Sequence, residues 1–283
     1  MFQKRLCKQI LVISILACLT GGETLATDVH RERQIAEEIR IRTNPDEVIW
    51  LEASGLKFQG LYREAVSKDI RGGVILLHGR HSNQDAADVV RPLRQSLPEH
   101  GWNSLSLAMP VSEPDDLQGH AALLSEAIAR LQSGVAFLKQ KNIGNIALLA
   151  HDTGAWAALS YFAQPPDQAV KSVVLIDPAS TRDLDPPPVS PGSLNTIRLP
   201  ILEILSNRIT APIGEEASRK RAAMKGNSSY RQLVLNEPDN GWQDVGGFLV
   251  NHIHGWLTRP PMSAGSEAET PSQIEKQGGA NQK

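Results

Sequence analysis

The sequence contains few cysteines and few aromatic residues. The two cysteines are Cys7 and Cys18, and Phe, Trp and Tyr together make up 5% of the 283 residues. Because no cysteine follows position 18, the body of the chain can form no disulfide and offers no thiol nucleophile. A disulfide-bonded scaffold and a thiol-dependent enzyme are therefore both excluded.

The sequence also lacks an excess of charge of either sign. Its 29 basic and 31 acidic residues give a formal charge of −2, and 41% of the residues are hydrophobic. This balance suits one large globular domain or two small ones. It provides no electrostatic attraction to nucleic acid or anionic lipid, so we expect no nucleic-acid partner.

Long apolar runs are scarce, and the longest is Ile10–Leu19. Lys4, Arg5 and Lys8 precede it, and Thr24-Leu25-Ala26 follows with small residues suited to cleavage. This pattern predicts a signal peptide over residues 1–26 and a periplasmic or secreted protein. A membrane anchor is the alternative, but a spanning helix needs about 20 apolar residues. A lipoprotein modified at Cys18 is a further, less favoured alternative.

Three segments are predicted after the signal peptide. Residues 27–44 are highly charged with interspersed isoleucines, which indicates a helical or linker segment. Residues 45–258 form the predicted domain. Residues 259–283 are rich in Gly, Ser, Pro and Gln and are predicted to be a disordered tail. Cleavage after Ala26 would leave 26 basic and 30 acidic residues and no transmembrane anchor.

Apolar strand patterns alternate with helical patterns through the domain, which predicts a mostly parallel sheet with helices on both faces. The predicted strands span residues 48–53, 56–65, 73–78, 103–109, 145–151, 171–177, 200–206 and 231–237, and the first two form an antiparallel hairpin. The predicted helices span residues 86–97, 118–141, 214–224 and 243–257, and another begins near 154. Ligands of such sheets bind beyond the carboxyl ends of the strands.

The strand that begins "VILLHGRHSN" ends in His78-Gly79 and continues through Arg80 and His81. A strand ending in His-Gly resembles the oxyanion loop of α/β-hydrolases, whose backbone N–H groups face a developing negative charge. Gly79 permits close backbone approach, and His78 can brace the loop. The alternative is that His-Gly only makes a tight turn.

The stretch "LLAHDTGAWAAL" has the pattern of a nucleophile elbow, with small residues at Ala150 and Gly154 around a strained turn. The central position holds Asp152, and the N–H of Thr153 is a candidate oxyanion donor. His151 is interpreted as a packed imidazole in preference to a base. Haloalkane dehalogenases and epoxide hydrolases have a similar motif with a nucleophilic aspartate. They also carry a helical cap, for which residues 178–199 leave no room.

A hydrolase triad needs an acid and a histidine after the nucleophile. Asn207 stands where an acid is usual, and Asp177 is the substitute. The loop before Trp242 contains no histidine, so His252 and His254 are the nearest candidate bases, although helical histidines more often have packing or surface roles. Trp242 is expected to pack or to line the cleft.

Other chemistry has weaker support. No histidine spacing matches a usual zinc pair, although four histidines could gather near the site: His78, His81, His120 and His151. No Gly-rich phosphate loop follows a strand, so we expect no cofactor. Serine nucleophiles would matter only if the elbow were not the site; the candidates are Ser82, Ser125 and Ser206.

These stretches together resemble the α/β-hydrolase superfamily over residues 45–258, with a sheet of eight strands and no large cap domain. They are most similar to a family of exported proteobacterial α/β-hydrolase-like proteins of unknown function, through "GGVILLHGRHSN", "VVRPLRQSLPEHGWNSLSLAMP" and "NIALLAHDTGA". The resemblance implies the fold and the His-Gly loop, together with an elbow residue that is often not serine. It implies no activity.

Two functional hypotheses follow. The favoured one is a non-catalytic protein that binds a small molecule, an envelope component or a protein partner in the cleft. The other is a hydrolase of carboxylic esters or related acyl bonds, in which Asp152 forms an intermediate or activates water above oxyanion donors at Gly79 and Thr153.

Overall fold

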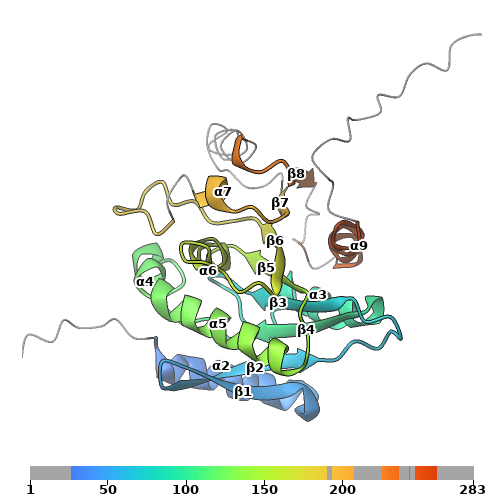
Figure 1. Cartoon of the computed structure of the whole chain (residues 1–283). Helices are drawn as coiled ribbons and strands as arrows, with labels where there is room; N and C mark the ends of the chain where they lie inside the picture. The colour runs from blue at the N-terminus through green and yellow to red at the C-terminus, as the bar shows by residue number, and fades with distance from the viewer. Residues whose placement is uncertain (1–26, 190–192, 207–224, 236–241, 243–245, 260–283) are drawn as a thin grey trace, which may run out of the picture.

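The computed structural model describes residues 27–189, 193–206, 225–235, 242 and 246–259. An eight-stranded sheet runs through the molecule in the order β1-β2-β4-β3-β5-β6-β7-β8 (Figure 1). Its strands are β1 (Val48–Ala53), β2 (Leu56–Arg63), β3 (Gly72–Leu77), β4 (Trp102–Leu107), β5 (Ile146–His151), β6 (Val170–Ile176), β7 (Ile201–Ser206) and β8 (Tyr230–Leu235). The predicted mostly parallel sheet is confirmed.

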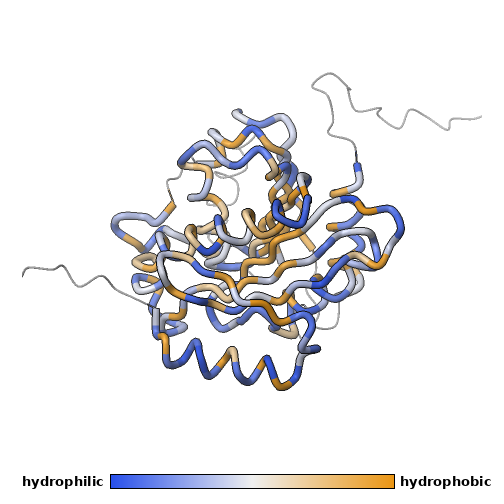
Figure 2. The backbone as a smooth tube through the Cα atoms, turned by 60° about the horizontal axis from the view of Figure 1, so that its bottom comes forward, coloured by the Kyte–Doolittle hydropathy of each residue, from blue (hydrophilic) through white to orange (hydrophobic). Residues whose placement is uncertain are grey.

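The strands differ in how they are buried. Strands β3, β4 and β7 are buried along their whole length, as expected for parallel strands covered on both faces. The tube in Figure 2 is accordingly orange through the central strands and mostly blue at the periphery. At the edge, β1 and β2 form the predicted antiparallel hairpin, whose turn residues Ser54 and Gly55 have φ angles of 51° and 79°.

Helices cover both faces of the sheet. One face packs against α5 (Leu124–Gln140) and α6 (Gly154–Tyr161), and the other packs against α3 (Val90–Ser96) and α9 (Gly246–Leu257) (Figure 1). The predicted helix 118–141 is interrupted: α4 (Leu117–Ala122) and α5 are separated by Leu123, whose ψ of 3° leaves the helical region while its side chain is buried. The predicted helix 214–224 lies outside the described residues.

Two buried arginines join elements that are distant in sequence. Arg94 on α3 is 1% exposed; it binds Asp85 at 2.7 Å and also Glu47, in the 3-10 helix η1 (Pro45–Glu47). Arg130 on α5 is equally buried and contacts Glu32 on α2 (Val29–Arg42) at 2.7 Å. Helix α2 is thus attached to the sheet domain by a buried ion pair.

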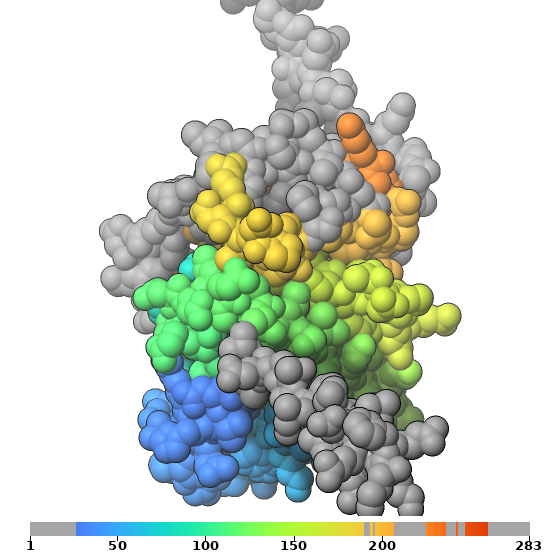
Figure 3. Space-filling model, turned by 90° about the vertical axis from the view of Figure 1, so that its left-hand side faces the viewer, coloured from blue at the N-terminus to red at the C-terminus, as the bar shows by residue number. Residues whose placement is uncertain are grey.

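The connection after β6 contains one short helix among its described residues, α7 (Ser193–Thr196). In Figure 3 the yellow surface of this connection lies above the green surface of α4 and α5. No helix in the described part of the chain combines the length and the hydropathy needed to cross a membrane.

Candidate functional site at the strand–helix elbow

The elbow connects β5 to α6 by a sharp turn at Asp152. This residue has a φ of 50°, in the left-handed region that a side-chain-bearing residue seldom adopts. A Cβ on Gly154 would lie 2.6 Å from the carbonyl oxygen of Leu77 and 2.7 Å from that of His78. The turn therefore requires glycine at position 154, and it projects the Asp152 side chain from the carboxyl end of β5.

The carboxylate of Asp152 is held by Arg80. Oδ2 accepts a hydrogen bond from the Arg80 backbone N–H at 3.0 Å, and Nε of the same arginine lies 3.2 Å from Oδ1 and 3.1 Å from Oδ2. The side chains of Arg80 and Asp152 are 31% and 14% exposed. A half-buried ion pair with an additional backbone hydrogen bond therefore occupies the elbow.

The same contact occupies a donor of the expected oxyanion loop. The Arg80 N–H is shared between Asp152 Oδ2 and Thr153 Oγ1, at 3.0 and 3.1 Å. A Cβ on Gly79 would lie 2.5 Å from Asp152 Oδ2 and 2.8 Å from the Thr153 nitrogen, so the two loops approach closely. In a hydrolase such donors face the substrate oxyanion. Here the N–H of Arg80, next to the expected donor at Gly79, binds a carboxylate of the protein itself.

His78 lies under this loop and connects it to the next strand. Its Nε2 accepts from the Met109 N–H at 3.0 Å, so the proton resides on Nδ1, which donates to the Gly79 carbonyl at 2.9 Å. Burial lowers the pKa of His78 to about 4, and the positive charge of Arg130 acts in the same direction. His78 is a neutral brace of the Gly79 loop.

Asp177 follows β6 and also has a positive φ, of 43°. Its Oδ1 accepts from the Ser206 N–H at 2.6 Å, and its Oδ2 accepts from Nε1 of Trp242 at 2.9 Å. Burial raises the pKa of Asp177, and these two hydrogen bonds and the nearby His151 oppose the rise. Asp177 and Trp242 are thus brought together, while Asn207 lies outside the described residues.

His151 precedes the elbow aspartate and lies near Asp177. Its Nδ1 is buried and has no hydrogen-bond partner within the described part of the chain. The imidazole is therefore packed, as expected.

His120 is the site residue that the elbow and triad patterns missed. It lies on α4, where its pKa is lowered mainly by burial and raised by the charge of Asp152. Its Nε2 is buried and finds no partner among the described residues. His120 and Thr153 both line a small cavity of about 30 Å³ beside the elbow. The available signal was the position of α4, which follows the carboxyl end of β4.

The other candidate histidines are not brought to the elbow. His254 on α9 stacks on His100, with 4.4 Å between the ring centroids. His100 directly precedes β4, so this contact lies at the amino-terminal ends of the strands, opposite the elbow. His252 donates from Nδ1 to the Phe248 carbonyl one turn earlier in α9. The expectation that either could serve Asp152 is corrected by this geometry, because α9 directs both away from the elbow.

The four candidate histidines are not grouped as metal ligands in the described part of the chain, although His120 lies near His78 and His81. His81 is exposed and contacts Asp115 at 3.1 Å. Within the described ranges, no three His, Cys, Asp or Glu side chains are grouped as ligands of a metal ion would be.

Residues 23–121 and 111–259 match the protein family described as "Protein of unknown function (DUF3530)". The chain belongs to this family. The match includes the Gly79 loop and the elbow, so both are features of a family member. No curated protein matches the chain.

Solved structures of esterases are similar in fold. An esterase of Pyrococcus furiosus, Pf2001, superposes with a TM-score of 0.59 at 17% identity and covers 74% of this chain and 90% of its own. Est1E from Butyrivibrio proteoclasticus has a TM-score of 0.59 at 12% identity, covering 75% and 100%. A cold-adapted esterase from an Arctic intertidal metagenomic library gives 0.59 at 13%, covering 75% and 93%. The DUF3530 chain therefore has the α/β-hydrolase fold.

Proposed function

We propose that this chain is an exported, non-catalytic α/β-hydrolase-like protein that binds a small molecule, an envelope component or a protein partner. The observation that carries the proposal is the ion pair between Asp152 and Arg80, in which the elbow side chain accepts the Arg80 N–H at 3.0 Å. The Asp152 carboxylate is thus paired with Arg80 and bound to the loop beside the expected donor at Gly79, which leaves it less available to attack an ester.

The histidines support the same proposal. All eight histidines lie within the described residues, and none is hydrogen-bonded to Asp152 or Asp177. An alkyl ester on Asp152, of the kind that haloalkane dehalogenases form, needs a group that activates water for its hydrolysis. Without such a group, the ester would form once and persist.

Export is part of the proposal and rests on the first 26 residues. The basic cluster before Ile10–Leu19 and the small residues at 24–26 support a signal peptide. We infer a periplasmic or secreted mature protein that begins at Thr27.

A hydrolase of carboxylic esters is the second candidate, and His120 favours it. Its imidazole is within the electrostatic reach of Asp152, and its buried Nε2 has no partner in the described part of the chain. In this alternative, Asp152 attacks or positions water, and His120 transfers the proton.

Ester turnover separates the two candidates. Purified wild type, Asp152→Ala and His120→Gln are incubated with p-nitrophenyl esters of short, medium and long acyl chains. Equal rates in all three proteins support the non-catalytic proposal. A rate about 100-fold or more lower in Asp152→Ala than in wild type, the size of a general acid–base contribution, would contradict the non-catalytic proposal and support the hydrolase. A matching loss in His120→Gln would assign the base.

A further inference from the structure

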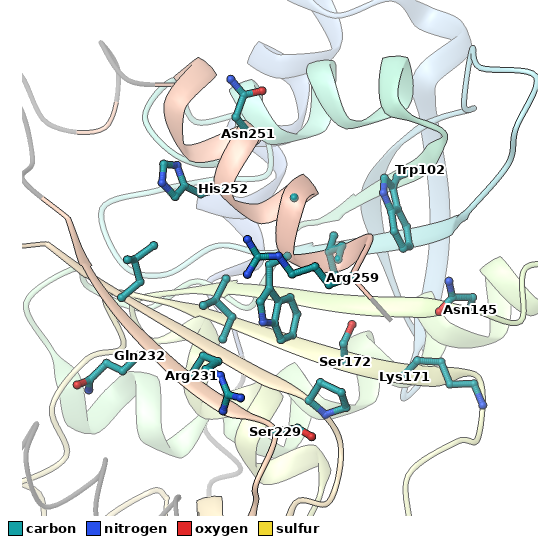
Figure 4. A pocket seen from close by; sticks show the side chains of 16 residues that line it. Trp102, Asn145, Lys171, Ser172, Ser229, Arg231, Gln232, Asn251, His252 and Arg259 are labelled. Atoms are coloured by element: carbon teal, nitrogen blue, oxygen red, sulfur yellow. The ribbon is translucent and has the colours of Figure 1, made fainter. Parts of the chain in front are cut away.

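A large cavity lies at the end of the sheet opposite the elbow. Its volume is about 870 Å³, within the range of small-molecule sites. It opens where strands begin, because its lining includes Trp102 at the start of β4, Lys171 in β6 and Ser229 before β8. Figure 4 shows this cavity between α9 and the strands.

The cavity is bounded by one side of α9. Gly255 and Trp256 are a turn beyond Asn251 and His252, and Arg259 follows a turn later. Arg259 extends from the end of α9 across the cavity, with Trp102 and Asn145 on one side and Arg231 and Gln232 on the other (Figure 4).

The floor of the cavity is apolar. Leu202 and Leu233 come from neighbouring strands of the sheet, and Trp256 and Leu257 come from α9. These residues belong to, or pack against, the apolar core between the sheet and α9. The cavity is therefore an unfilled end of that core, open to an apolar chain.

Charge at the cavity has one sign. Lys171, Arg231 and Arg259 line it, and no Asp or Glu is among the described residues of its lining. This differs from the chain as a whole, in which 31 acidic residues balance 29 basic ones. An apolar floor with basic residues around it fits a molecule with an apolar tail and an anionic head group.

We infer that this cavity binds a single-chain fatty carboxylate. The alkyl chain lies on the floor made by Leu202, Leu233 and Trp256, and the carboxylate pairs with Arg259 or Lys171 at the opening. The cavity lies at the amino-terminal ends of the strands, whereas Asp152 lies at the carboxyl end of β5. Binding in the cavity therefore does not depend on whether Asp152 is reactive.

Calorimetric titration of the purified protein tests the ligand class. Dodecanoate is compared with dodecyl maltoside and dodecyltrimethylammonium, each below its micellar concentration. We expect dodecanoate to bind about tenfold more tightly than either, since the three share an apolar chain and differ in the charge of the head group. Equal binding of the three, or no binding of dodecanoate, would overturn the inference.

Gly255 allows a variant that fills the cavity. A Cβ at Gly255 meets nothing within 4 Å, and the same is true of Gly247 on the same helix, which does not line the cavity. Gly255→Leu and Gly247→Leu therefore make the same change in the same helix, and replacing glycine favours helix formation in both. We expect Gly255→Leu to weaken dodecanoate binding at least about tenfold and Gly247→Leu to leave it unchanged.

Thermal unfolding of both variants establishes that they are folded. Equal dodecanoate affinity in Gly255→Leu and wild type would contradict the cavity as the site. A protein that does not bind free dodecanoate but binds phosphatidylglycerol vesicles, with equal binding in Gly255→Leu, would have a membrane-binding surface in place of the cavity site. That result would also overturn the inference. Ester turnover decides the proposed function independently.

Discussion

Asp152 and Arg80 meet because two loops from neighbouring strands approach unusually closely. Gly79 in the loop after β3 leaves space for the Asp152 side chain, and the turn after β5 directs that side chain toward it. The sequence predicted both loops and their adjacency through the His-Gly and elbow patterns. It could not predict the ion pair, because the direction of a long arginine side chain follows from packing and not from a local pattern.

A substitution at Gly79 tests how closely the two loops approach each other. Gly79→Ala would place a methyl group 2.5 Å from Asp152 Oδ2, so we expect the free energy of unfolding to fall by about 1–3 kcal/mol. Chemical denaturation measures the change. Gly144→Ala is the control, because a Cβ there meets nothing within 4 Å. Equal stability of the two variants would show that the loops are further apart than described.

The buried His78 predicts a dependence of stability on pH. Its pKa is lowered from 6.5 to about 4, so the unfolded chain binds a proton more readily, and stability falls as the pH drops below 6.5. The loss by pH 4 should be about 3 kcal/mol. Urea denaturation between pH 4 and 7 should show a shallower pH dependence for His78→Gln than for wild type. Parallel profiles would contradict the neutral, buried state.

His120 illustrates the limit of sequence reasoning at the residue scale. The elbow and triad patterns place a histidine after the nucleophile, whereas His120 comes before it on α4. Its proximity to Asp152 depends on how α4 packs beside the carboxyl ends of β4 and β3. The reverse applies to His252 and His254, which have the expected order in sequence but lie on a helix that directs them elsewhere.

The strands were more predictable at the element scale than the helices. Continuous apolar runs identify buried parallel strands, and the predicted ranges agree with β3, β4, β5, β6 and β7 to within two residues at each end. The break at Leu123 was not predicted, because helical periodicity continues through it. The Leu123 side chain is buried at this break.

The buried ion pair of Arg130 attaches α2 to α5, and a substitution at Arg130 tests how much it stabilises the protein. Arg130 is 1% exposed and binds Glu32, Glu126 and the Ala108 carbonyl. Arg130→Met would leave these acceptors without their partner, so we expect a loss of about 3–5 kcal/mol in the free energy of unfolding.

The control for that variant is on α2 itself. Arg40 forms an exposed ion pair with Glu37, and exposed pairs contribute little. Arg40→Met should therefore leave the denaturation midpoint unchanged. Similar midpoints for Arg130→Met and wild type would mean that the buried ion pair does not hold α2 in place.

At the scale of the whole molecule, the fold is that of esterases, while the elbow carries an aspartate clamped by an arginine. The fold followed from the order of strands and helices in the sequence. Function does not follow from a shared fold, because chemistry resides in particular side chains and their spacing. The cavity beside α9 was not predicted either, because its lining comes from strand starts and one helix far apart in sequence.

Export predicts the first residue of the mature protein. Cleavage after Ala26 would make Thr27 the first residue of the mature protein. Thr27 is buried, and its Oγ1 accepts a hydrogen bond from the Val111 N–H at 2.7 Å. N-terminal sequencing of the protein recovered from its producing cells should therefore begin at Thr27. A chain that retains Met1 would contradict processing by a signal peptidase.

Asp152 is paired with Arg80, and we infer that it performs no covalent chemistry. The protein is incubated with a p-nitrophenyl ester in water enriched in oxygen-18, and the peptide containing Asp152 is then weighed by mass spectrometry. An Asp152 carboxylate that attacked the ester would expel p-nitrophenolate and form a mixed anhydride, and water that then attacked Cγ of Asp152 would release the acid and leave oxygen-18 on the aspartate. We predict a peptide mass identical to that of a control without ester. Ester-dependent gain of oxygen-18 at Asp152 would contradict the account.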